Sequence, residues 1–114
     1  MRRFTAALIA SAAMLSAATG IAHADPDTDF GNQLHTYGIY GPKDYNAWIG
    51  KITCKRIYTN VDTDAYHSAK FVSAQLPKDS TTEQAWQFLG AAIDFYCPEE
   101  RVILDRAAGT PPHR

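Results

Sequence analysis

The side chains best able to ligate a metal or act as nucleophiles beyond the first 24 residues are two cysteines and three histidines: Cys54, Cys97, His35, His67 and His113. Helical zinc sites commonly place two histidines three or four residues apart, and a complete site needs three or four protein ligands. None of these histidines stands three or four residues from another. We therefore expect neither a metal site nor a metal cofactor.

One adjacent pair, His67-Ser68, invites comparison with a nucleophile and its base. Neighbouring residues on a helix point about 100° apart, so these two side chains are not expected to meet. The sequence also lacks the G-x-S-x-G elbow of serine hydrolases and a glycine-rich phosphate loop. We expect no catalytic residues, and hence not an enzyme.

Tyrosine is frequent for a chain of this size, and both tyrosine and histidine can ligate haem iron. Tyr66 with His67 is the candidate site for such a ligand. The alternative explanation is that the tyrosines lie half-buried with their hydroxyl groups in water. We favour that explanation and expect no cofactor, and we keep a haem-type small-ligand carrier as the second hypothesis.

The N-terminus predicts export. Arg2 and Arg3 precede an uncharged, apolar stretch over residues 4–18, and Ala22-His23-Ala24 forms an A-x-A cleavage pattern before Asp25. This order of features is typical of a secretory signal peptide, which we assign to residues 1–24. The protein is therefore expected to be secreted or to stay in the cell envelope, outside the cytoplasm.

Removal of 24 residues from the 114-residue chain leaves one small domain, expected over residues 25–108, with a disordered tail at 109–114. The shortened chain has 9 basic and 12 acidic residues. Without a basic stripe or a polybasic run, nucleic acid is not an expected partner. No stretch after the signal peptide is long and apolar enough for a membrane span, so we expect a protein or an envelope component as partner.

Two cysteines in an exported chain most often form a disulfide, and no C-x-x-C motif suggests a redox role. A bond between Cys54 and Cys97 would close a loop of about 44 residues, which stabilises the fold by about 4 kcal/mol in the chain-entropy model. We expect this disulfide to be structural.

Hydrophobic residues recur at helical spacing and never alternate over a strand length, so the predicted fold is all-α. The four main helices are expected at about 27–37, 43–58, 64–75 and 80–97, and residues 98–107 could add a short fifth. On the fourth helix, Ala91 falls on the polar half and Phe95 does not fit the pattern. The predicted product is a small disulfide-linked bundle.

The helix ends are predicted from local signals. A capping box of Ser80 and Glu83 is expected to begin the fourth helix. Gly38 and Asn60 suit the left-handed conformation that ends a helix. The other expected N-caps are Asp27, Thr28 or Asp29 for the first helix, and Asp62 or Thr63 for the third.

Tyr45, Trp48 and Ile52, hereafter the aromatic stripe, lie on a different face of the second helix from Cys54. Trp48 is about 120° from the cysteine around the helix, and Ile52 about 160°. Lysines interleave with the stripe, and with Lys55 it forms a candidate interaction patch, because an aromatic surface edged by charge is typical of a protein–protein contact. Coverage of the stripe by the first helix is the outcome we favour, since most tryptophans in small domains pack.

Several of these residues together resemble the small secreted actinobacterial, chiefly mycobacterial, family called domain of unknown function 732. The residues that carry the resemblance are Asp29-Phe30, Leu34, Gly38-Ile39, Ala47, Gly50, Cys54, Ile57, Ala85, Ala92-Ile93 and Tyr96-Cys97-Pro98. The family often has a glycine after its first cysteine-bearing helix, where this chain has Asn60. The resemblance implies a small, helical, disulfide-linked exported domain and implies no activity.

Overall fold

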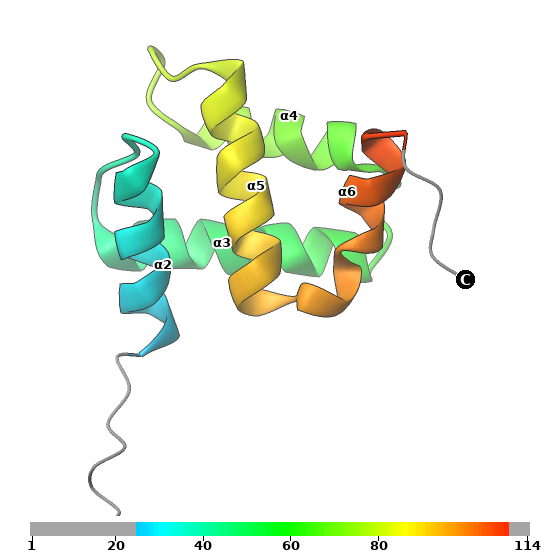
Figure 1. The fold of residues 1–114 in the computed structure, drawn as a ribbon, viewed down its shortest axis with the longest axis horizontal. Helices are drawn as coiled ribbons and strands as arrows, with labels where there is room; N and C mark the ends of the chain where they lie inside the picture. Colours follow the sequence, from blue (N-terminus) through cyan, green and yellow to red (C-terminus); the bar gives the residue numbers. More distant parts are fainter. Residues whose placement is uncertain (1–24, 110–114) are drawn as a thin grey trace, which may run out of the picture.

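The computed structural model describes residues 25–109, and this part of the chain contains helices and no strand (Figure 1). The elements are α2 (Pro26–Thr36), α3 (Lys43–Tyr58), α4 (Ala65–Gln75), α5 (Thr82–Tyr96), a 3-10 turn (Pro98–Glu100) and α6 (Val102–Ala107). The predicted all-α fold with four main helices and a short C-terminal one is confirmed. The predicted signal peptide, and the tail beyond Gly109, lie outside the described residues.

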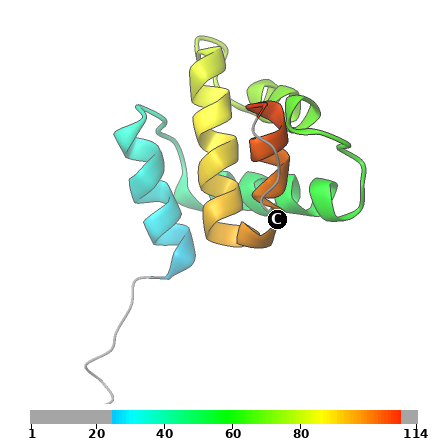
Figure 2. The same cartoon turned by 45° about the vertical axis from the view of Figure 1, so that its right-hand side comes forward.

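Helix α5 is central to the bundle and packs against α2, α3 and α4. Helices α2 and α5 run side by side in opposite directions, and both cross α3 (Figures 1 and 2). The short α6 packs against α4, on the side of α5 away from α2. Within residues 25–109, this arrangement leaves the back of α3 without a covering helix.

The helix α2 begins earlier than the sequence indicated. Its N-cap is Asp25, whose carboxylate accepts a 2.8 Å hydrogen bond from the N–H of Thr28, and Pro26 occupies the first turn. Proline suits this position because it lacks only an N–H that the helix would leave unpaired. The predicted caps Asp27, Thr28 and Asp29 are wrong, since all three lie inside the helix.

The capping box of α5 is one residue later than predicted. The hydroxyl of Thr81 accepts the N–H of Gln84 (3.0 Å), and the Gln84 side chain accepts the N–H of Thr81 (2.9 Å). Gln84 also donates to the carbonyl of Tyr37 at 3.0 Å. The pair Ser80 and Glu83 was wrong because Ser80 belongs to the preceding turn, where its N–H donates to Pro77.

The N-cap of α4 is Asp64, and neither Asp62 nor Thr63 takes that place. The N–H of His67 donates to the Asp64 carboxylate and holds the pKa of that group below its ordinary value. Asp62 is instead buried, where Arg56 donates two hydrogen bonds to it at 2.9 and 3.0 Å. Asp62 does not cap α4 because its carboxylate accepts both hydrogen bonds from Arg56, which belongs to α3.

Two helix ends follow the prediction. Gly38 and Asn60 have φ values of 78° and 63°, in the left-handed region. After the first of these turns, Ile39 is buried and its N–H donates to Leu34. The loop between α2 and α3 is thereby fixed against the core.

The core has two adjoining parts, one around Phe30 and Phe88 and one around the disulfide. The assignment of Ala91 to a polar face is wrong, since this residue is 4% exposed. Phe95 is half-buried, with its ring centroid 5.9 Å from that of Phe30. Both deviations have one cause, because α2 covers a second side of α5 that the sequence pattern assigned to solvent.

Candidate functional site

The aromatic stripe lies on the outward face of α3. Trp48 is 57% exposed and Tyr45 is 41% exposed, and their ring centroids are 6.1 Å apart. Ile52 is half-buried in the same row, and Lys55 is exposed one turn further along the helix. The structure thus places all four predicted patch residues on one face, and the favoured expectation that the first helix covers them is wrong.

The reason is the position of Gly50 on the opposite side of α3. A Cβ atom on Gly50 would lie 2.9 Å from a ring carbon of Tyr96 and 3.1 Å from ring carbons of Phe30. Glycine therefore allows α2 and α5 to approach the inner face of α3 closely. With α2 held there, no described element remains to cover Trp48.

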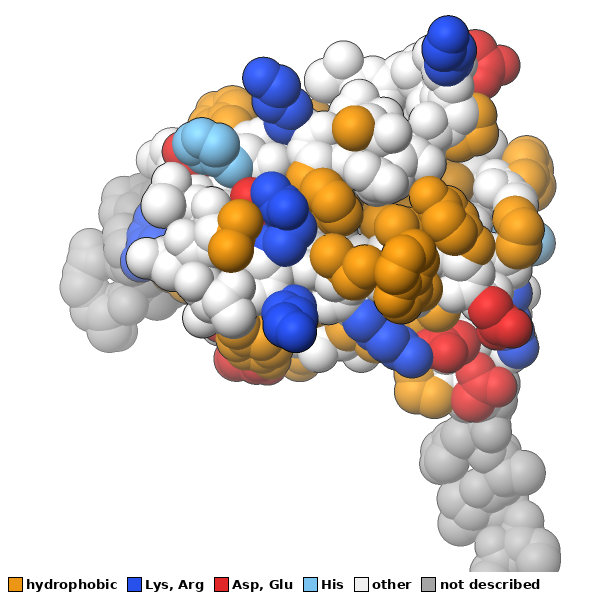
Figure 3. Space-filling model, turned by 180° about the vertical axis from the view of Figure 1, so that it is seen from behind, with side chains coloured by type: hydrophobic (Ala, Val, Ile, Leu, Met, Phe, Trp, Pro, Cys, Tyr) orange, Lys and Arg blue, Asp and Glu red, His pale blue; other side chains and the backbone are white. Residues whose placement is uncertain are grey.

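Figure 3 shows this side of the molecule, where hydrophobic side chains gather with Lys and Arg along part of the margin. Lys51 lies beside the stripe and forms an ion pair of 3.2 Å with Asp27. Within residues 25–109, Lys55 has no carboxylate at ion-pair distance. The margin therefore offers at least one unpaired positive charge to an approaching partner.

A depression of about 260 Å³ adjoins the stripe where the loop before α3 meets the end of α4. Tyr45 lines it and also belongs to the stripe, so the two features are continuous. Tyr40, which is 64% exposed, also lines it, as do Asn46 and Gln75. We call this depression the tyrosine cleft.

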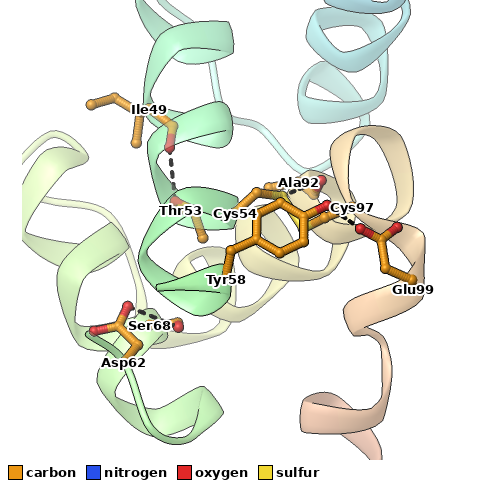
Figure 4. The surroundings of a disulfide bond; sticks show 9 residues. All are labelled: Ile49, Thr53, Cys54, Tyr58, Asp62, Ser68, Ala92, Cys97 and Glu99. Atoms are coloured by element: carbon orange, nitrogen blue, oxygen red, sulfur yellow. Dashed lines mark hydrogen bonds between the residues drawn. A yellow bond between two sulfur atoms is a disulfide. The ribbon is translucent and has the colours of Figure 1, made fainter. Parts of the chain in front are cut away.

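The structure joins Cys54 to Cys97 by a disulfide, with 6.0 Å between the two Cα atoms (Figure 4). Both cysteines are buried, and the Tyr58 ring lies beside the bond with its hydroxyl donating to the carboxylate of Glu99. That hydrogen bond lowers the pKa of Glu99 and raises the pKa of Tyr58. The bridge fastens the second half of α3 to the end of α5, as the sequence predicted.

The candidate haem ligands are both engaged in contacts within the protein. The hydroxyl of Tyr66 donates to the carbonyl of Ala107 at 3.2 Å, and its ring packs edge-on against Trp86. The Nδ1 atom of His67 lies 2.8 Å from the Asp64 carboxylate. Tyr66 lines a shallow depression of about 250 Å³, and His67 does not contribute to it. Tyr66 and His67 are thus adjacent in sequence but make separate contacts.

The pair of His67 and Ser68 is likewise divided between two environments. His67 is exposed, whereas Ser68 is fully buried and its hydroxyl donates to Asp62 at 3.0 Å. The Ser68 hydroxyl therefore helps to fix the loop before α4.

Among the described residues, no group of three or more His, Cys, Asp or Glu side chains is arranged to hold a metal ion. No helix between residues 25 and 109 combines the length and hydropathy that membrane crossing requires.

Sequence reasoning missed the tyrosine cleft. None of Tyr40, Asn46 and Gln75 was singled out from the sequence. One signal was present, because Asn46 is a polar residue on the side of α3 that carries the buried residues Ala47, Ile49 and Gly50. The cleft itself combines two loops that are about 30 residues apart in sequence, and their meeting depends on tertiary packing.

Comparison with known proteins assigns the chain to a family. The family model described as "Protein of unknown function (DUF732)" matches residues 26–99. Two Mycobacterium tuberculosis proteins, uncharacterized protein MT0585 of strain CDC 1551 and uncharacterized protein Rv0559c of strain H37Rv, are each 57% identical over 83 residues, which is 73% of this chain and 74% of each relative. No solved structure matches the chain. The match covers α2 to α5 and both cysteines, and the chain therefore belongs to the DUF732 family.

Proposed function

We propose that this protein is an exported, non-catalytic binding module that captures a protein partner through the aromatic stripe and Lys55. The observation that carries the proposal is the exposure of Trp48, 57%, on a rigid helix that a disulfide anchors to the core. Tryptophan and tyrosine are enriched among the residues that dominate protein interfaces. An exposed cluster of this kind on a small domain is characteristic of a contact surface.

Export is part of the proposal and is supported by two independent features. The N-terminal sequence has the order of a secretory signal, ending at Ala24. Disulfides persist in oxidising compartments and are rare in the cytosol of most organisms, so the bond between Cys54 and Cys97 suits an extracytoplasmic protein. The domain at work would then be residues 25–108, at or beyond the cell envelope.

Structural contacts account for several polar side chains that could otherwise take part in catalysis. Asp62, Arg56 and Ser68 form one network that holds the loop before α4. Asp64 and Thr81 cap helices. These contacts give a structural role to side chains that would otherwise be candidates for chemistry.

The test is capture of a partner from envelope extracts by the chain that begins at Asp25. Wild-type protein and two variants are immobilised in parallel: Trp48→Ala, which removes the centre of the stripe, and Tyr58→Ala, which removes a similarly exposed aromatic residue elsewhere on α3. We expect a partner retained by wild type and Tyr58→Ala and lost by Trp48→Ala. Equal retention by all three proteins would contradict the proposal.

A further inference from the structure

The tyrosine cleft contains an amide group that the fold leaves without a partner. Asn46 is 7% exposed, and its backbone N–H donates to Pro42 at 3.1 Å. Within residues 25–109 its side-chain carboxamide has no hydrogen-bond partner, although it lines the cleft. Leaving a buried polar group unpaired is unfavourable, so a ligand that hydrogen-bonds to this amide would gain affinity from it.

The space above this amide exists because Gly41 has no side chain. A Cβ atom built on Gly41 would lie 3.6 Å from Nδ2 of Asn46, in contact with the amide. Gly41 has a φ of 126°, a conformation that other residues rarely adopt. On the far side, the half-buried Gln75 presents a second carboxamide that has no hydrogen bond to any described residue. The floor of the cleft thus carries two uncommitted amides.

Two tyrosine rings line the cleft, and each lies near another aromatic ring. Tyr40 packs against His35 with 5.1 Å between the ring centroids, and Tyr45 packs against Trp48. Among residues 25–109, no charged side chain lines the cleft. A second depression, of about 460 Å³, shares Tyr40, Gly41 and Pro77 with it and extends towards Gln84. The two depressions adjoin, so a chain-like ligand can extend from the cleft into the second depression, whose lining includes one carboxylate, Asp79.

These features exclude most of the ways in which folded domains recognise peptides. Strand addition needs a sheet edge, and residues 25–109 form no strand. Helix binding needs an apolar groove that takes anchors over at least two helical turns, whereas this depression is only about 260 Å³ and also carries two amides. Phosphopeptide recognition needs an arginine cluster, whereas this lining is uncharged. Recognition of a polyproline II segment fits better, because it uses aromatic walls together with donors for the exposed backbone carbonyls.

We propose that the tyrosine cleft binds an extended, proline-containing segment of the protein partner, held as a polyproline II helix. Its proline rings pack against Tyr40 and Tyr45, and the amides of Asn46 and Gln75 donate to its carbonyl groups. Because Tyr45 belongs to both features, the segment leads directly onto the aromatic stripe. This inference rests on the proposed function and specifies the chemistry of the partner.

The experiment measures fluorescence anisotropy of a labelled decaproline peptide with the chain from Asp25 onwards, and with three variants. Tyr40→Ala removes an exposed wall, Asn46→Leu removes the floor amide at similar volume, and Tyr58→Ala is the control, an exposed tyrosine outside the cleft. We expect saturable binding by wild type and Tyr58→Ala, and a dissociation constant about tenfold higher for Tyr40→Ala and Asn46→Leu. Thermal unfolding checks that each variant is folded. If Asn46→Leu does not fold, the dissociation constant of Tyr40→Ala alone decides the outcome.

Absence of binding to decaproline, or unchanged binding by Tyr40→Ala, overturns the inference. Equal binding of a labelled Gly-Ser decapeptide also overturns it, because proline would then make no contribution. Saturable binding of a neutral oligosaccharide such as maltohexaose in place of decaproline assigns the cleft to sugars and rejects the peptide. Envelope capture that still depends on Trp48 would, in each of these cases, leave the proposed function standing, so the two failures are distinguishable.

Discussion

The hydroxyl of Tyr96 donates a 2.7 Å hydrogen bond to the carboxylate of Asp27, and this bond joins the last turn of α5 to the first turn of α2. The same carboxylate pairs with Lys51 of α3 at 3.2 Å. The Lys51 ammonium also lies 5.5 Å from the centroid of the Tyr96 ring. Three helices therefore meet at one small polar cluster, and Lys51 of this cluster borders the aromatic stripe.

This cluster makes stability depend on alkaline pH. Burial, followed by the hydrogen bond to Asp27 and the charge of that carboxylate, raises the pKa of Tyr96 above its ordinary value of 10.0. A group whose pKa is higher in the folded state stabilises that state fully below its unfolded pKa, and the contribution is lost as the pH rises above it. We expect the free energy of unfolding to fall between pH 10 and 12 in the wild type.

The matched variants are Tyr96→Phe and Tyr45→Phe. The first should lower stability by about 1 kcal/mol at pH 7 and flatten the alkaline decline, because it removes the hydrogen bond and the ionisable group together. The second changes an exposed tyrosine and should keep the wild-type profile. Urea unfolding at several pH values measures both effects, and an alkaline decline of equal steepness in Tyr96→Phe would contradict this account.

The close contact at Gly50 gives a second prediction. An alanine methyl group there would come within 2.9 Å of Tyr96 and 3.1 Å of Phe30, so Gly50→Ala should destabilise the fold by about 1–3 kcal/mol. Gly90, in the interior of α5, has no atom within 4 Å of the same position. Gly90→Ala should therefore stabilise the fold by about 0.5–1 kcal/mol through helix propensity. If both substitutions shifted the melting temperature in the same direction, the close contact at Gly50 would not be the cause of the effect there.

Local signals were enough to predict the helices because helix formation depends on residues three or four positions apart. The span of α3, Lys43–Tyr58, and the turns at Gly38 and Asn60 follow from sequence for that reason. The caps were less predictable, since several polar residues stand near each helix start. Asp62 and Asp64 both suit a cap, and only the position of Arg56 in space assigns one of them to the buried pair.

The candidate site was less predictable from the sequence than the helices, because its exposure and shape depend on tertiary packing. Helical spacing placed Tyr45, Trp48 and Ile52 on one face, and it left open whether another helix covers that face. The answer lies in where α2 packs, which Gly50 decides through contacts with Phe30 and Tyr96. The tyrosine cleft brings together residues 40–46 and 75–77, and no local pattern encodes the meeting of two distant loops.

The disulfide provides a third prediction. A sequence separation of 43 between Cys54 and Cys97 corresponds to about 4 kcal/mol in the chain-entropy model. Purified exported protein should have no free thiol, and Cys54→Ala should lower the melting temperature by more than about 10 °C. Ellman titration under denaturing conditions measures the thiols. Two titratable thiols per chain in protein recovered from outside the cytoplasm would contradict the predicted bridge.

Contacts made by Tyr66 and His67 lead to a fourth prediction. Since the Tyr66 hydroxyl donates to Ala107 and the His67 ring lies against Asp64, neither is directed to a shared ligand. Hemin at micromolar concentration should therefore produce no saturable Soret shift with the chain from Asp25 onwards. A saturable shift that Tyr66→Phe or His67→Ala abolishes would instead support the small-ligand carrier.

The last prediction concerns Trp48 and separates surface from core directly. Because 57% of Trp48 is exposed, Trp48→Ala should lower the free energy of unfolding by less than about 1 kcal/mol. Phe88 is fully buried between α5 and its neighbours, and Phe88→Ala should cost about 3–5 kcal/mol. Urea unfolding of the two variants against wild type gives both numbers. A loss for Trp48→Ala as large as that for Phe88→Ala would mean that the stripe is part of the core, and a stable variant that no longer captures the partner would identify Trp48 as a contact residue.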